Sequence, residues 1–306
     1  MRIAVLGGLG FIGSHLVDAF KARGDNVVVF DNGSQATVEA RESKADWSVS
    51  VDVRNLAGYE RIHFDGFDWV IHAASPAGPA RIAPGYALQP IIEATAEGLR
   101  FAQASGARFI KFSTSEVYGR ADIRLDESAP CIVPSRYDAR SEYAIGYLAA
   151  ECLCANHPLP NVSVLRLFNV VGPRQRPEAG VVLPRFCQQA RAGVPLTVYG
   201  DGMQRRAFLY VGDLVRLVLT MTEHPLDGKH LWNVADPWNE TSILNLAKLV
   251  IETHGDGTLV LGGQPSYRES AEKCNVSIYA VTEQWGWRPA TTLKEIVKRC
   301  LESTVA

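Results

Sequence analysis

The chain has 306 residues, a formal net charge of −2 and a pI near 6.4. It is long enough to bury a sizeable core, and the absence of a basic stripe argues against nucleic acid or an anionic membrane surface as a partner. No apolar stretch reaches the length of a membrane span and strand-like sequence begins at residue 2, so we expect no signal peptide and a cytoplasmic protein. The six cysteines have neither a CxxC pair nor metal-ligand spacing, so we expect reduced thiols and no bound metal.

The first 31 residues read as strand, glycine turn, helix and strand. An apolar run, Ile3–Leu6, leads into Gly7, Gly10 and Gly13, and a second run, Val27–Phe30, ends at Asp31. A Cβ in such a turn would clash with the bend, with an approaching pyrophosphate or with the strand beneath the helix, whose free N–H groups point at phosphates. Asp31 would accept hydrogen bonds from an adenosine ribose and repel a 2′-phosphate. The pattern therefore predicts NAD rather than NADP, and a tight turn without a ligand is the weaker alternative.

Short apolar runs alternate with helix-length segments through the first 170 residues. Buried strands are expected at Ile3–Leu6, Val27–Phe30, Trp69–His72, Phe109–Ser113 and Val162–Leu167. This alternation predicts an α/β fold built on a doubly wound parallel sheet. Helical spacing over residues 90–105 and 141–155 predicts two neighbouring helices that could form a homodimer surface.

The texture changes after Gly172, where prolines interrupt short apolar stretches. We expect a cofactor-binding domain over residues 1–172, with later returns to the sheet near 207–235, at Phe208–Val211 and Trp232–Val234. Residues 173–206 and 236–306 would form a smaller mixed region that binds substrate. Helices are expected there at Ile243–Thr253 and Leu293–Ser303.

Ligands of open parallel sheets bind beyond the carboxyl ends of the strands, so the residues after each strand are candidates. The small side chains of Ala73 and Ala74 would let a cofactor lie close to the protein. We expect His72, within an apolar run, to be packed and hydrogen-bonded rather than catalytic. The full set of expected cofactor-binding residues is Gly7, Gly10, Phe11, Ile12, Gly13, Asp31, Asn32, Asp52, Val53, Ala73, Ala74, Tyr143 and Tyr147.

The segment Ser113–Gly119 places hydroxyls and a carboxylate at one strand end. A hydroxyl there can orient a substrate alcohol, and a glutamate near apolar walls can act as a general acid or base. The alternative is an N-cap on the next helix, for which Ser or Thr would be ordinary.

Five segments together resemble the extended short-chain dehydrogenase/reductase family, whose members act on nucleotide-diphosphate sugars. They are the glycine turn, Ser113–Gly119, Arg166–Arg174, Pro195–Gly202 and Tyr210–Leu214, and the resemblance extends through Trp285–Pro289. Within this Rossmann-type family, His72–Ala77, the triplet Thr114-Ser115-Glu116 and Gln204–Phe208 are most similar to the UDP-glucuronate decarboxylases that make UDP-xylose. The 4,6-dehydratases usually carry Asp at position 115, and the 4-epimerases usually lack a glutamate at position 116.

The resemblance implies a mechanism as well as a cofactor. A tyrosine removes the proton of the sugar 4-hydroxyl while NAD oxidises C4, and the resulting β-keto acid loses carbon dioxide. The residues implied in catalysis are Thr114, Ser115, Glu116, Tyr143 and Arg206. Those implied in holding the UDP-sugar are Asn169, Arg174, Tyr199, Gln204, Arg206 and Arg268, and arginine suits a diphosphate because of its fork of donors.

The family signature Tyr-x-x-x-Lys is altered here. Its match is Tyr143 to Tyr147, registered by Glu151, so tyrosine stands in the lysine position; a second frame from Tyr137 also lacks lysine. The lysine would hold the nicotinamide ribose and lower the tyrosine pKa, and a free tyrosine is only about 0.1% ionised at pH 7. The positive nicotinamide ring would offset part of this loss. Arg140 could supply a charge, but we expect it to be a solvated surface residue.

The C-terminal region also departs from the family, since Lys273–Tyr279 replaces its usual Asp before Ser-Lys-Ala, which leaves Arg268 a weak assignment. The leading hypothesis is an NAD-dependent UDP-glucuronate decarboxylase, a carboxy-lyase. A 4-epimerase or 4,6-dehydratase is the alternative enzyme. A non-catalytic NAD-binding protein is the alternative of another class, favoured by Tyr147 and opposed by the acid/base set.

Overall fold

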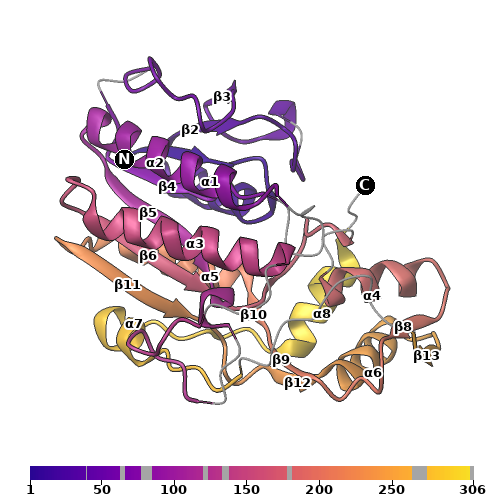
Figure 1. The fold of residues 1–306 in the computed structure, drawn as a ribbon. Coiled ribbons are helices and arrows are strands. Elements are labelled where there is room, and N and C mark those ends of the chain that lie inside the picture. Colours follow the sequence, from indigo (N-terminus) through magenta and orange to yellow (C-terminus); the bar gives the residue numbers. More distant parts are fainter. Residues whose placement is uncertain are drawn as a thin grey trace.

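The computed structural model describes residues 1–38, 40–62, 66–76, 85–119, 123–132, 138–177, 181–263 and 274–303. Its main feature is a parallel sheet of seven strands in the order β11-β6-β5-β4-β1-β2-β3 (Figure 1). The strands are β1 (Arg2–Leu6), β2 (Asn26–Asp31), β3 (Trp47–Ser50), β4 (Trp69–His72), β5 (Arg108–Thr114), β6 (Val162–Leu167) and β11 (Lys229–Val234). The chain runs outward from β1 to β3, then crosses to β4 and runs outward to β11. The strand order therefore reverses between β1 and β4, where such sheets bind ligands.

Two pairs of helices cover the sheet. The helices α2 (Leu88–Ser105) and α3 (Ala139–Asn156) pack side by side, as do α1 (Phe11–Arg23) and α5 (Val211–Glu223). Apolar residues alternate between the faces of β1: Ala4 and Leu6 pack in a cluster with residues of α2 and α3, and Ile3 and Val5 in one with residues of α1 and α5. These side chains have no exposed surface, which explains why the strands read as continuous apolar runs.

A smaller region packs around its own core. It contains α4 (Val182–Arg191), α6 (Ile243–His254) and α8 (Leu293–Glu302), and the two-stranded ladders β8 (Leu196–Val198) with β13 (Leu259–Leu261) and β9 (Arg205–Ala207) with β12 (Glu240–Ser242). The helix α7 (Tyr279–Trp285) returns to β11. The remaining elements are the ladder of β7 (Val170–Val171) with β10 (Leu209–Tyr210) and the short helices η1 (Ala40–Glu42) and η2 (Ser115–Tyr118).

The expected fold class and its five strands are confirmed, and so are the neighbouring helices. Two details differ. The edge strand β3 was not anticipated, because none of its side chains is fully buried and it lacks an apolar run. The chain returns to the main sheet at β11 as expected, but residues 208–211 do not join it: Leu209 and Tyr210 pair with β7 before α5 begins.

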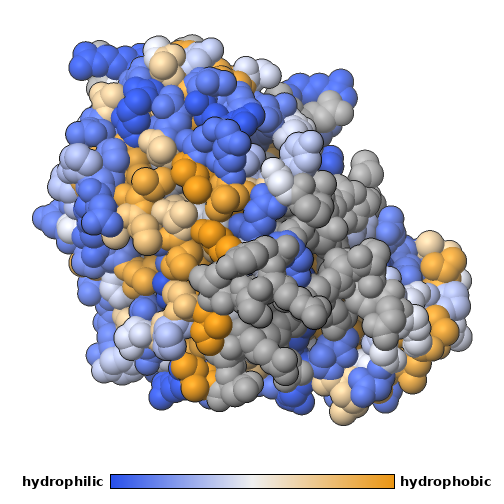
Figure 2. Space-filling model, in the orientation of Figure 1, coloured by the Kyte–Doolittle hydropathy of each residue, from blue (hydrophilic) through white to orange (hydrophobic). Residues whose placement is uncertain are grey.

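The surface and the thiols add further observations on the described residues. Figure 2 shows apolar side chains gathered over the helices α2 and α3. In the parts of the chain that the structure describes, none of the six cysteines forms a disulfide, and no group of three or more metal-binding side chains occurs. Over the same parts, every helix is too short or too polar to cross a bilayer.

Candidate active site

The glycine turn after β1 is packed too tightly for side chains at two of its three positions. Gly7 has φ +81°, and a Cβ on it would lie 2.6 Å from backbone atoms of Ala74. A Cβ on Gly13 would lie 2.1 Å from the Gly7 carbonyl oxygen. Gly10 differs: it is the N-cap of α1 with a φ of −75°, and its Cβ would meet nothing closer than 3.4 Å. The turn therefore brings the N-terminus of α1 to the carboxyl ends of β1 and β4, and a Cβ at Gly10 would make only ordinary contacts.

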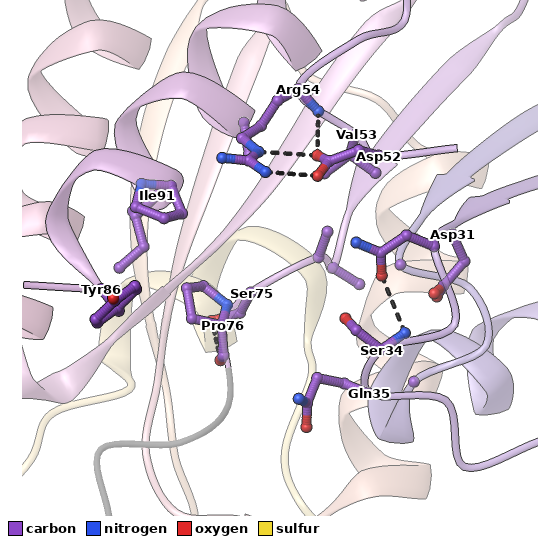
Figure 3. Close-up of a pocket in the computed structure, with 17 residues that line it drawn as sticks. Asp31, Ser34, Gln35, Asp52, Val53, Arg54, Ser75, Pro76, Tyr86 and Ile91 are labelled. Atoms are coloured by element: carbon purple, nitrogen blue, oxygen red, sulfur yellow. Dashed lines mark hydrogen bonds and ion pairs between the residues drawn. The ribbon is translucent and has the colours of Figure 1, made fainter. Parts of the chain in front are cut away.

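A cavity of about 250 Å³ lies at this point, where the strand order reverses (Figure 3). In Figure 3, Asp31, Ser34 and Gln35 line one side, and Tyr86 and Ile91 line the opposite side. The expected cofactor-binding residues that it brings together are Gly7, Gly10, Asp31, Asn32, Asp52, Val53, Ala73 and Ala74. Phe11 and Ile12 instead pack against the apolar cores from the first turn of α1.

Two carboxylates of the cavity are held in fixed orientations. The Asp31 carboxylate accepts hydrogen bonds from the backbone N–H groups of Leu9, at 3.0 Å, and Gly33, at 2.8 Å. Asp52 forms a two-pronged ion pair with Arg54, at 3.0 Å and 2.7 Å, and this hydrogen bonding lowers the pKa of Asp52. Arg54 was not singled out by the sequence, because an arginine in a loop carries no signal until the fold places it on the cavity wall.

The two tyrosines of the altered signature lie one helical turn apart on α3. Their ring centroids are 4.8 Å apart with planes at 61°, and the Tyr147 hydroxyl donates to the Ser75 Oγ, at 2.7 Å. Ser75 lines the cavity, so Tyr147 reaches the candidate cofactor site through this bond. Desolvation raises the pKa of Tyr143 well above 10, and its interactions with Tyr147 and the nearby charge of Glu116 raise it further. Desolvation also raises the pKa of Tyr147.

Glu116 lies on η2, directly after β5, and faces the first turn of α3. Its Oε1 is 3.0 Å from Nη1 of Arg140, with 14% and 13% of the two side chains exposed. The interpretation of Arg140 as a solvated surface residue is therefore wrong: the packing of α3 against η2 encloses it. The Thr114 Oγ1 accepts the Glu116 backbone N–H, at 3.2 Å, so the N-cap interpretation of this segment applies to Thr114. That bond uses an acceptor position and leaves the hydroxyl proton for another partner. Ser115, beside it, is buried.

A buried polar network fixes α3 against the sheet below the site. Glu151 accepts the Ser113 hydroxyl, at 2.5 Å, and the Arg166 Nη2, at 2.7 Å. The Arg166 guanidinium lies 4.7 Å from the centroid of the Tyr118 ring. Because Ser113, Arg166 and Glu151 come from β5, β6 and α3, this network sets the position of α3 relative to β5, which ends at Thr114 and leads into Glu116 on η2.

The residues expected to hold a UDP-sugar lie in or near the smaller region. Asn169 has the unusual φ of +37°, and its Nδ2 donates to the Ala207 carbonyl, at 3.0 Å, next to Arg206 on β9. Gln204 precedes β9, and Tyr199, after β8, has the Arg185 guanidinium 4.4 Å from its ring centroid. Arg174 is instead paired with Asp18 of α1, at 2.5 Å. Arg268 lies outside the described residues.

His72 is fully buried, and its Nε2–H donates to the Ala94 carbonyl, at 2.9 Å. Its expected role as a packed, hydrogen-bonded residue is confirmed. Its other ring nitrogen is then an acceptor, and Lys111, which the sequence did not single out, occupies it.

Curated relatives are decarboxylases of nucleotide sugars. The chain is 35% identical to UDP-glucuronic acid decarboxylase 4 of Arabidopsis thaliana. The match covers 96% of this chain and 66% of that protein, so this chain spans just under two thirds of the length of this relative. It is 31% identical to UDP-N-acetyl-alpha-D-glucosaminuronate decarboxylase of Bacillus cytotoxicus, over 85% of this chain and 82% of that protein.

Similar solved structures include epimerases. The UDP-glucose 4-epimerase of Thermus thermophilus in complex with NAD matches with a TM-score of 0.84 and 27% identity, over 99% of this chain and 98% of the other. A mutant UDP-glucuronic acid 4-epimerase from Bacillus cereus, in complex with UDP-4-deoxy-4-fluoro-glucuronic acid and NAD, matches with a TM-score of 0.83 and 26% identity, with the same coverage.

A family model described as "NAD dependent epimerase/dehydratase family" matches residues 3–235, which include the glycine turn, the cavity, both tyrosines and Glu116. The chain belongs to this family of NAD-dependent epimerases and dehydratases.

Proposed function

We propose that this protein is an NAD-dependent enzyme that oxidises C4 of a UDP-sugar, and that its reaction is the decarboxylation of UDP-glucuronate to UDP-xylose or UDP-4-keto-pentose. The residues at the cavity fit NAD. Gly10 leaves room for a pyrophosphate at the N-terminus of α1, and the Asp31 carboxylate stands on the cavity wall with lone pairs remaining for a ribose. When bound, NAD would take a hydride from the sugar C4 and return it at the end of the cycle.

The protein side of the proposed reaction is proton transfer and charge placement. Tyr143 takes the proton of the 4-hydroxyl, and Thr114 hydrogen-bonds the sugar at the same oxygen. With a 4-ketone and a carboxylate on C5, the bond from C5 to the carboxyl carbon breaks, carbon dioxide leaves, and the electron pair moves into the ketone as an enolate. A proton added at C5 restores the ketone. With C4 reduced again and the Tyr143 proton returned to O4, the product is the pentose. The proton added at C5 comes from solvent, so the net reaction takes up one proton and releases one carbon dioxide.

The observation that carries this proposal is the convergence of acid/base groups beside the cofactor cavity. Glu116 and Thr114 lie at the end of β5, Arg140 pairs with Glu116, and Tyr143 follows Arg140 by one helical turn. A protein that only bound NAD would have no use for a glutamate enclosed beside a tyrosine. Similarity to decarboxylases at 31–35% identity supports this choice of reaction. We assign to the substrate Arg206, Tyr199 and Gln204 of the smaller region, together with Asn169, which is hydrogen-bonded to Ala207 beside Arg206.

A 4-epimerase is the second candidate, supported by the likeness to the epimerase structures. The two reactions share oxidation at C4 and differ afterwards: an epimerase returns the hydride to the other face, whereas a decarboxylase first loses the C5 carboxylate. A 4,6-dehydratase would give a 4-keto-6-deoxy sugar. The products therefore separate all three reactions.

The test is mass spectrometry with carbon dioxide detection on purified protein incubated with NAD and UDP-glucuronate. The expected result is carbon dioxide together with a UDP-pentose or UDP-4-keto-pentose. UDP-galacturonate without carbon dioxide would identify the epimerase. No turnover of UDP-glucuronate, UDP-glucose or their relatives while NAD is bound would support the non-catalytic alternative.

We also infer that the protein is a homodimer formed through α2 and α3, over which apolar side chains gather (Figure 2). We further propose that residues 1–172 bind the cofactor and that residues 173–206 and 236–306 bind the substrate. Light scattering on the purified protein would give twice the mass of one chain, and a monomer at micromolar concentration would contradict the dimer.

A further inference from the structure

Lys111 is a buried cation in the middle of β5. Only 1% of its surface is exposed, although its neighbours Phe109, Ile110 and Phe112 form an apolar run. Its Nζ donates to the Nδ1 of His72, at 3.2 Å, and lies 5.3 Å from the centroid of the Tyr147 ring. Within the described residues, no carboxylate lies within ion-pair distance of this ammonium. Its partners are therefore a neutral imidazole and the face of an aromatic ring.

Such a placement is costly for folding. Desolvation lowers the pKa of Lys111 to about 8, so at neutral pH the group is still mostly charged. A leucine or methionine at the same position would fill the space without a charge to desolvate. His72 gains little from the contact in return, because its Nε2 is already fixed by Ala94. The cost points to a use for the charge itself.

The groups facing Lys111 show where that charge acts. From β4 it meets His72, which burial and the nearby ammonium keep neutral. From α3 it meets Cys154, whose thiol pKa burial raises to about 12, and Tyr147. From α2 comes the Ala94 carbonyl, bound by His72. The one facing group that reaches the candidate active site is Tyr147, through the Ser75 hydroxyl and through its ring contact with Tyr143.

We propose that Lys111 is a positioning residue whose ammonium, held against the Tyr147 ring from β5, supplies the positive charge that favours ionisation of the Tyr143–Tyr147 pair. A lysine at position 147 would provide this cation from α3. Here the cation comes instead from Lys111 on β5, and it acts through Tyr147. A cation on a ring face in a dry environment favours extra electron density on that ring and its oxygen. This partly opposes the desolvation that holds both phenols in the neutral form. The catalytic consequence rests on the proposed function.

The ionisation can be measured without turnover. The NAD-bound protein is labelled throughout with a fluorinated tyrosine of lower intrinsic pKa, so that the phenols ionise while Lys111 is still an ammonium. Fluorine NMR then follows the pair against pH, with resonances assigned from Tyr143→Phe and Tyr147→Phe. Lys111→Gln removes the charge and keeps a donor for His72, and Lys111→Met is a second neutral variant. Lys294→Met is the control, because Lys294 is an exposed lysine on α8.

Both neutral variants at Lys111 should weaken the ionisation of the pair by about tenfold or more, the effect expected of a unit charge at this distance in a protein interior. Lys294→Met should leave it unchanged. In the Tyr147→Phe background, Lys111→Gln should shift Tyr143 by less than half as much. A change below twofold in folded, NAD-bound Lys111→Gln and Lys111→Met would overturn the inference. This readout needs no substrate, so a protein without decarboxylase activity could still show the shift in tyrosine ionisation. Full turnover in Lys111→Gln would refute the role of Lys111 and leave the proposed function standing.

Discussion

The Arg140 guanidinium and the Glu116 carboxylate lie 3.0 Å apart and are both largely enclosed, although 24 positions separate them in the sequence. The contact forms because α3 packs against η2, the short helix that follows β5. It holds the carboxylate near Tyr143 and fixes its direction. In the proposed reaction Glu116 handles protons around the sugar, while Tyr143 takes the proton of the 4-hydroxyl.

Replacing Glu116 by Gln should therefore lower turnover of UDP-glucuronate by about 100-fold or more, the usual contribution of a positioned acid/base group. The amide keeps the shape of the side chain, so the affinity for NAD should stay within about twofold. Steady-state kinetics and calorimetric NAD titration check the two parts. An unchanged rate would remove Glu116 from the mechanism. Arg140→Met should lower the rate, and it should lower the free energy of unfolding by up to about 3 kcal/mol, because it removes the cation that faces this largely enclosed carboxylate.

Substitutions at two glycines of the turn should have different effects: one should weaken NAD binding, and the other should lower the stability of the fold. Gly10→Ala adds a methyl group at an ordinary φ of −75°, with no neighbour within 3.4 Å, so the free energy of unfolding should change by less than about 1 kcal/mol. The same methyl group would meet the pyrophosphate, so NAD affinity should fall about tenfold or more. Gly13→Ala is the matched variant: its Cβ would lie 2.1 Å from a backbone oxygen, and we expect a loss of about 2 kcal/mol or more. Equal NAD affinity in wild type and Gly10→Ala would contradict pyrophosphate binding there.

Asp31 should make the protein prefer NAD. Its carboxylate is held by the backbone N–H groups of Leu9 and Gly33, so it cannot turn away from a 2′-phosphate. We expect NAD to bind at least about tenfold more tightly than NADP in calorimetric titrations. Asp31→Asn should reduce the ratio of the affinity for NAD to the affinity for NADP. Equal affinities for the two cofactors in the wild-type protein would refute this role of Asp31.

The fold and part of the site are predictable from the sequence for a simple physical reason. Strands buried on both faces tend to be continuous apolar runs, and Ile3–Leu6 of β1 and Val27–Phe30 of β2 are such runs. The glycine turn is predictable because only glycine fits beneath Ala74. In contrast, β3 lies at the sheet edge with no buried side chain and leaves no comparable pattern.

The tertiary contacts of charged residues leave no such pattern. From the sequence, Arg140 is indistinguishable from a surface arginine, and only the packing of α3 shows that it is enclosed. Lys111 is a single charged residue within an apolar run. The loss of lysine at position 147 is visible in the sequence. The ammonium beneath Tyr147 becomes visible only when β5 and α3 are placed together.

This ammonium changes the expected outcome of restoring the signature. If the missing lysine were the only obstacle, Tyr147→Lys would raise activity. The new ammonium would instead lie close to Lys111, and two like charges at such a distance in a protein interior cost about 3 kcal/mol. We therefore expect Tyr147→Lys alone to be destabilised with little gain in rate, and the double variant with Lys111→Met to be more stable and more active than the single one. Thermal unfolding and turnover measured on both variants check this. A large gain in the single variant would show that the two cations are separated.

The pH dependence of stability gives an independent measure of Lys111. Its pKa is about 8 in the folded protein, against 10.5 for an ordinary lysine, so between these values the unfolded chain binds a proton that the native state does not. Stability contributed through this group must then rise with pH across that interval and stay level below it. Relative to Lys111→Met, the free energy of unfolding of the wild-type protein should gain about 3 kcal/mol from pH 8 to pH 10.5, measured by urea denaturation. His72 is neutral in both states over this interval and adds no slope. The Cys154 thiol ionises near pH 9 in the unfolded chain but stays neutral in the native state, so it adds a falling slope, which both proteins share and which the comparison with Lys111→Met removes. Parallel curves for the two proteins would mean that the Lys111 ammonium is solvated and does not bear on the Tyr147 ring.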